Sequence, residues 1–157
     1  MLGKQLEDKK YLINFIIYFL IIYFVFQYFL EDFFIRLLAN ITSHIINTNT
    51  IGNIIIFKDK IFVVSPACSG VFELSLLLSF ILSTLKVKLK YKVIYGVFSL
   101  IIFSISNIGR IVLIILYSDS KDYLFIHNLI SFILYPVILA LNFIWILILK
   151  KLNVISS

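Results

Sequence analysis

The stretch VIYGVFSLIIFSISNIGRIVLIILY, residues 93–117, is apolar throughout and contains a single formal charge. A helix needs about 20 predominantly apolar residues to cross the hydrocarbon core of a bilayer. Three further stretches meet this requirement, at residues 11–30, 66–85 and 127–149, with one formal charge among them. We therefore predict an all-α integral membrane protein with about four transmembrane helices.

The composition supports this class. Of the 157 residues, 62% are hydrophobic, 17% aromatic and 14% charged, which is far more apolar than a soluble domain of this length. No small-residue cleavage site follows the first apolar stretch, so we expect a retained anchor rather than a removed signal peptide. We find no internal repeat or linker, and predict one membrane domain over residues 1–157.

The basic residues predict the orientation, because cytoplasmic flanks of membrane helices are enriched in lysine and arginine. One predicted side has lysines packed against the helix ends: Lys4, Lys9, Lys10, Lys86, Lys88, Lys90, Lys92, Lys150 and Lys151. We therefore expect a multi-pass protein of the plasma membrane with both termini in the cytoplasm and with residues 31–65 and 118–126 outside. This bias accounts for the net charge of +6, so lipid and not nucleic acid is the expected neighbour.

The predicted outer segment has its own order. Residues 33–46 have apolar side chains at helical spacing and predict an amphipathic helix along the interface. Two runs of β-forming residues, 54–57 and 61–64, flank a charged turn and predict a short β-hairpin between the first two membrane helices. In the last membrane helix, Pro136 should produce a kink because it removes a backbone hydrogen bond.

The single cysteine, Cys68, lies in the sequence SPACSG, residues 65–70. Ser65 is a good N-cap and Pro66 suits the first helical position, so Cys68 should lie in the first turn of the second membrane helix. The helix dipole there favours an anion, and therefore a thiolate. Gly70 leaves room for another backbone to approach. The alternative is a small apolar residue buried near a helix end.

Two further side chains fall toward the same face of the membrane. Arg110 lies about 10 Å short of the outer end of its helix, one turn after Asn107. A buried arginine usually faces a protein interior or a wet cavity. It could instead snorkel, or pair with Glu73, which we expect to be an orienting group. His127 opens the last helix and could shuttle protons or be structural. With Cys68, these groups form a candidate thiol active site.

Three pieces of sequence, in this order, have a counterpart in a known family: PACSG at 66–70, NIGRI at 107–111, and His127. Over roughly residues 50 to 150, the chain resembles the exosortase/archaeosortase family of membrane-embedded cysteine transpeptidases. Many relatives have additional helices or a soluble extension. This chain looks like a short, core-only member, which leaves room for an additional membrane subunit as a partner. About one turn after His127, Ser131 stands where the family leads us to expect glycine.

The resemblance implies catalytic roles for three residues. Cys68 would attack a peptide carbonyl, His127 would protonate the leaving amine, and Arg110 would stabilise the oxyanion or the thiolate. The supporting residues of the site would be Ser69, Gly70, Glu73 and Asn107. The implied substrate is an exported protein with a C-terminal sorting tail, made of a short motif, a transmembrane helix and basic residues. It would be cleaved at the outer face and transferred to an acceptor nucleophile.

Other functions compete with this one. The chain could be a non-catalytic small subunit of a secretion, polysaccharide-export or assembly complex, with Glu73 and Arg110 paired as structural glue. A thiol-dependent acyltransferase acting on lipid is less well supported, because no second acyl-handling motif is present. One cysteine and two scattered histidines do not make a metal site, so we expect neither a metal nor a cofactor.

Overall fold

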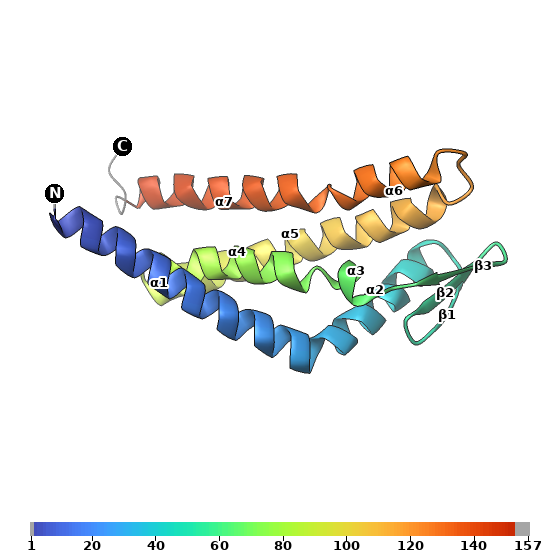
Figure 1. The fold of residues 1–157 in the computed structure, drawn as a ribbon, viewed down its shortest axis with the longest axis horizontal. Helices are drawn as coiled ribbons and strands as arrows, with labels where there is room; N and C mark the ends of the chain where they lie inside the picture. Colours follow the sequence, from blue (N-terminus) through green and yellow to red (C-terminus); the bar gives the residue numbers. More distant parts are fainter. Residues whose placement is uncertain (1, 153–157) are drawn as a thin grey trace.

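The computed structural model describes residues 2–152 and begins with a long helix that bends at a π-helical turn. Helix α1 (Leu2–Val25) continues through η1 (Phe26–Leu30) into α2 (Glu31–Ile45). Figure 1 shows α1 descending to this turn and α2 rising away from it toward the sheet. Short π-helical segments are a common cause of sharp bends. The predicted membrane helix and outer helix are therefore one bent helical run.

Helix α2 packs on the protein through one face and leaves apolar side chains exposed on another. Its buried residues are Ile35, Leu38, Ala39, Thr42 and Ser43. This face contacts α3, α5 and the sheet, whereas the apolar side chains of Phe33 and Ile45 are 61% and 55% exposed. The predicted helix is present, and its place along the membrane interface stays a prediction.

A three-stranded antiparallel sheet follows α2, in the order β1-β2-β3. The strands are β1 (Asn49–Ile51), β2 (Ile54–Phe57) and β3 (Lys60–Val63). The predicted hairpin is confirmed as β2 and β3, joined through Lys58 and Asp59, which both have positive φ values, as tight hairpin turns require. Strand β1 was not predicted. Buried Ile55 and Val64 anchor the sheet against α2 and α5.

The remaining helices form the apolar bundle. They are α3 (Pro66–Ser69), α4 (Val71–Ser83), α5 (Leu89–Leu116), α6 (Tyr123–Ser131) and α7 (Leu134–Lys151). Helices α4, α5 and α7 surround a core that includes Leu77, Phe103 and Trp145, and α1 packs on α4. In this core the indole of Trp145 donates a hydrogen bond to the hydroxyl of Thr84.

Three helical runs of the described chain are long and apolar enough to cross a membrane: Lys9–Ile45, Leu89–Leu116 and Tyr123–Lys151. Helix α4 is apolar but has only 13 residues, or about 20 Å of helix. The predicted class, a helical membrane protein with a small sheet between its first helices, is confirmed. The number of spans and their boundaries stay predictions.

The predicted kink in the last helix is a break at residues 132–133, just before Pro136. Proline has no N–H to donate to the carbonyl of Phe132, four residues earlier. The N–H of Tyr135 donates to that carbonyl instead, at 3.1 Å. The break separates α6, which contains His127, from α7. Figure 1 shows α6 and the sheet at one end of the molecule, and the start of α1 and the end of α7 at the other.

Candidate active site

Cys68 lies in a one-turn helix, not at the start of a long one. The predicted helix over 66–85 is divided at Gly70, whose φ of 70° is left-handed. A Cβ atom at this position would lie 2.8 Å from the ring of Phe103 and 3.2 Å from Nδ2 of Asn107. Glycine is therefore required both by the backbone conformation and by the close approach of α5. A four-residue helix has only a small dipole, so the expected dipole effect on Cys68 is weak.

Helix α5 holds the cysteine turn by its backbone. Nδ2 of Asn107 donates hydrogen bonds to the carbonyls of Cys68 and Ser69, both at 3.1 Å. Nη2 of Arg110 donates to the same Cys68 carbonyl, also at 3.1 Å. Both side chains are buried, with 1% and 6% of their surface exposed. The last carbonyls of a helix have no partner within it, and here two α5 residues supply the missing donors.

Ser69 ties the same turn to α2. Its hydroxyl contacts the carbonyl of Pro66 at 2.7 Å and a carboxylate oxygen of Glu31 at 3.2 Å, and it accepts the N–H of Val71 at 3.2 Å. We had placed Glu31 in the outer segment without a role. No local pattern relates it to Ser69, because the bend at η1 brings them together.

The ion pair considered for Glu73 and Arg110 is not formed. Among the described side chains, Asp119 pairs with two lysines, and no ion pair joins Glu73 to Arg110. The physical reason is the break at Gly70, which starts α4 on a new course and leaves the Arg110 guanidinium bonded to the Cys68 carbonyl. Nε of Arg110 is buried without a hydrogen-bond partner in the described chain.

Cys68, Arg110 and His127 line one pocket of about 440 Å³. They come from α3, α5 and α6, so the chain brings together all three predicted catalytic residues. The other lining residues are Ser65, Ala67, Glu73, Ile114, Asn128, Ser131, Phe132 and Tyr135. Cys68 is half-buried and is a free thiol. The pocket therefore has a thiol, a guanidinium and an imidazole in its lining.

His127 is half-buried, and its ring packs on that of Tyr123, with centroids 5.7 Å apart. Within the described chain no residue donates a hydrogen bond to its ring or accepts one from it. The hydroxyl of Ser131 donates a hydrogen bond to the His127 carbonyl at 2.7 Å. Ser131 therefore stabilises α6 at the position where the family resemblance leads us to expect glycine. The imidazole is thus free to interact with a molecule in the pocket.

Ser65 has a role that we did not predict. Its backbone is extended at the start of α3, as an N-cap requires, but its side chain makes no capping hydrogen bond. Its hydroxyl lies instead 3.6 Å from the sulfur of Cys68, and its carbonyl accepts the Cys68 N–H at 2.8 Å. The S-x-x-C spacing was the available signal, and it was interpreted only as a helix cap.

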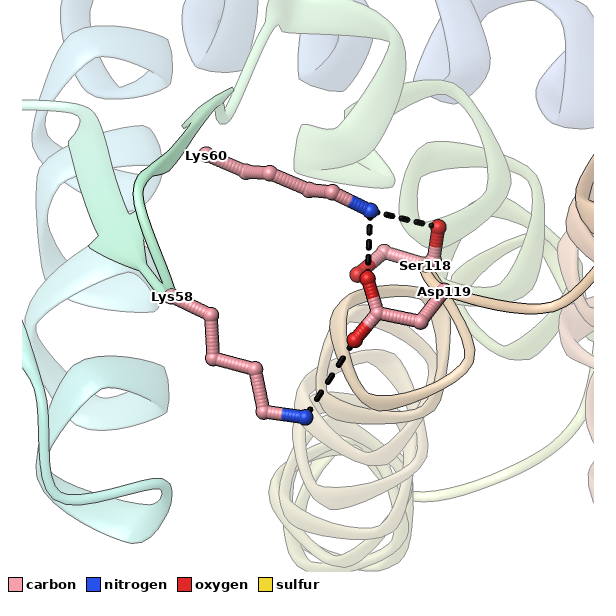
Figure 2. A network of polar contacts seen from close by, with 4 residues as sticks. All are labelled: Lys58, Lys60, Ser118 and Asp119. Atoms are coloured by element: carbon pink, nitrogen blue, oxygen red, sulfur yellow. Dashed lines mark hydrogen bonds and ion pairs between the residues drawn. The ribbon is translucent and has the colours of Figure 1, made fainter.

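A charged bracket lies outside the pocket (Figure 2). Nζ of Lys58 lies 3.2 Å from Asp119, and Nζ of Lys60 lies 2.5 Å from the same carboxylate and 3.0 Å from the Ser118 carbonyl. The hydrogen bond from Lys60, followed by that from Lys58, lowers the pKa of Asp119 below its ordinary value. The bracket therefore persists from neutral pH into the acid range. It ties the β2–β3 turn to the loop that leads into α6.

Gly70→Ala is expected to destabilise the site. The left-handed conformation alone costs a non-glycine residue about 1–2 kcal/mol, and the added methyl group would push against Phe103. Thermal denaturation of the protein in detergent should show a lower Tm. Gly109→Ala is the matched control, because it lies in α5 with no atom within 4 Å of an added Cβ. Equal Tm values for the two variants would contradict this account of the turn.

Comparison with known proteins identifies the family of the chain. Residues 8–144 match the family described as transmembrane exosortase (Exosortase_EpsH). A protein named "Probable archaeosortase D" from Methanocaldococcus jannaschii is 41% identical over 145 residues, which cover 92% of this chain and 94% of that protein. No solved structure matches. The chain therefore belongs to the exosortase/archaeosortase family of membrane proteins.

Proposed function

We propose that this protein is a membrane cysteine transpeptidase, which cleaves the C-terminal sorting signals of exported proteins at the outer face and transfers them to an acceptor. The observation that carries the proposal is the single pocket lined by Cys68, Arg110 and His127. Family membership supports it, as does the name of the archaeal relative. The alternative of a non-catalytic subunit invoked a Glu73–Arg110 pair, a contact that the described chain does not make.

In the first half-reaction, the Cys68 thiolate attacks the carbonyl carbon of the scissile peptide and a C–S bond forms. The Arg110 guanidinium, held beside the nucleophile on the Cys68 carbonyl, places a positive charge near the developing oxyanion. The C–N bond then breaks, and His127 donates its proton to the leaving amine. The products are a thioester on Cys68 and the released tail of the substrate.

In the second half-reaction, the acceptor nucleophile attacks the thioester carbon. Neutral His127 takes the proton from the acceptor, the C–S bond breaks, and the Cys68 thiolate is restored. The half-buried position of Cys68 limits access of bulk water to the thioester, which favours transfer over hydrolysis.

The charge pattern supports an outward-facing site. The start of α1 and the end of α7, with its lysines Lys150 and Lys151, lie at one end of the molecule, and α6 and the sheet lie at the other (Figure 1). If the lysine-rich end is cytoplasmic, His127 and the mouth of the pocket face outside. A substrate tail that crosses the membrane as a helix would then present its cleavage motif at this level.

A thioester on Cys68 is the expected intermediate. Exported proteins of the source organism with a motif–helix–basic tail would be co-expressed with the chain, and intact-mass measurement should detect a hydroxylamine-labile adduct. Cys68→Ala is the control and should form none. Processing of a substrate without any adduct on Cys68 in rapidly quenched samples would contradict the proposed intermediate.

Labelling of single cysteines should confirm the orientation. In a Cys68→Ser background, Lys121→Cys is expected to react with a membrane-impermeant maleimide added to intact cells, because it lies in the exposed loop before α6. Lys88→Cys, just before α5, should react only after the membrane is permeabilised. The reverse pattern would place the pocket on the cytoplasmic side and overturn the proposed location.

A further inference from the structure

The sulfur of Cys68 has a hydrogen-bond partner that the proposed mechanism does not use. In the described chain this partner is the hydroxyl of Ser65, 3.6 Å from the sulfur. Both residues line the pocket. The N–H of Cys68, bonded to the Ser65 carbonyl at 2.8 Å, closes the turn that holds the two side chains together. The hydroxyl is not engaged in capping α3, so it remains available to the sulfur.

A hydrogen-bond donor at Ser65 matters because other features of the site do little to stabilise a negative charge on the Cys68 sulfur. Helix α3 is too short to stabilise a thiolate through its dipole. Four ionisable side chains line the pocket with Cys68, namely Arg110 from α5, His127 from α6, Glu73 from α4 and Tyr135 from α7, and Glu31 of α2 reaches the same turn through Ser69. None of these groups hydrogen-bonds the sulfur in the described chain, and Arg110 is bonded to the Cys68 carbonyl.

We propose that Ser65 is a further catalytic residue, whose hydroxyl donates a hydrogen bond to the Cys68 thiolate. The bond places a hydrogen-bond donor on the sulfur while it carries the negative charge of the attacking nucleophile. It also stabilises the sulfur as a leaving group when the thioester breaks. Its place in turnover rests on the proposed function, whereas its effect on the thiol does not.

The test compares two variants of the same shape. Ser65→Thr keeps the hydroxyl and Ser65→Val replaces it with a methyl group, and the extended backbone at this position suits both side chains. Because Cys68 is the only cysteine of the sequence, alkylation by iodoacetamide, followed by intact-mass measurement, reports on this thiol alone. The rate would be measured across the pH range on the full-length protein in detergent.

Ser65→Val is expected to be alkylated about tenfold more slowly than Ser65→Thr at pH 7, the effect of losing one hydrogen bond to a charged group. The two rates should converge at high pH, where the thiol is fully ionised. Ser106→Ala is the control, because its hydroxyl is bonded to the Ile102 carbonyl and does not line the pocket. It should behave like the wild type. Equal pH profiles for the Thr and Val variants would overturn the proposal. If both variants lose the same amount of Tm, the comparison of their alkylation rates still holds.

A second measurement separates this inference from the proposed function. With a processed substrate, Ser65→Val should reduce kcat/KM about tenfold relative to Ser65→Thr, and equal values would overturn the catalytic role. If the alkylation profiles differ as expected but the wild type processes no sorting tail, the transpeptidase proposal fails and the hydrogen bond to the thiolate stands.

Discussion

Cys68→Ala is expected to abolish processing of a co-expressed substrate while the protein accumulates in the membrane at the level of the wild type. The loss should exceed about 10³-fold, because no other side chain of the pocket can form the thioester. Accumulation should be normal, since the contacts that hold the turn use the Cys68 carbonyl and N–H and not its sulfur. Immunoblots of the substrate and of the tagged protein measure both quantities.

Cys68→Ser should be almost as inactive, because a hydroxyl is far less acidic than a thiol. Ala67→Ser is the matched control, since it places a hydroxyl on the same helix and in the same pocket. It should retain most of the activity. Full processing by Cys68→Ala would remove the transpeptidase proposal and favour a non-catalytic membrane subunit.

His127→Ala should reduce kcat/KM by about 10²–10⁴-fold, the usual contribution of general acid–base catalysis. The amine cannot leave without a proton, so formation of the thioester should be the step that slows. The variant should keep its Tm, because the ring contacts Tyr123 and makes no hydrogen bond within the described chain. Single-turnover measurements with a purified substrate would report on the thioester-forming step directly.

Two controls accompany His127→Ala: substitution of the next residue in the helix, and addition of free imidazole. Asn128→Ala removes the next residue of α6, which also lines the pocket, and should be close to the wild type. Added imidazole should partly restore His127→Ala if the ring acts as a proton donor. An unchanged rate, or an equal loss in both variants, would show that α6 supports the pocket only structurally.

Much of the fold followed from patterns local to the sequence. Apolar length predicted the membrane helices, β-forming runs predicted the hairpin of β2 and β3, and Pro136 predicted the break before α7. The three residues of the candidate site also follow from local motifs, and the structure adds that they line one pocket. Their catalytic roles stay predictions.

The features that were missed depend on contacts between distant parts of the chain. Hydropathy is continuous over residues 66–85, so it does not indicate a break at Gly70, which Phe103 of α5 helps to impose. The same break leaves Glu73 without the ion pair to Arg110 that we considered. The link from Ser69 to Glu31 depends on the bend at η1, and no periodicity reports such a bend. Sequence patterns therefore indicated which side chains line the pocket, but not their hydrogen-bond partners.

The hydrogen bonds from α5 to the cysteine turn also have a consequence for biosynthesis. Asn107 and Arg110 hold the cysteine turn from 39 and 42 residues further along the chain. While a ribosome is still adding α5, the turn at Cys68 has neither donor, and α6 with its histidine has yet to be made. The pocket around Cys68 is therefore assembled only after the later helices are in place. A chain that stalls halfway through membrane insertion therefore has the thiol but neither of the α5 donors nor the imidazole, and under the proposed function it would be inactive.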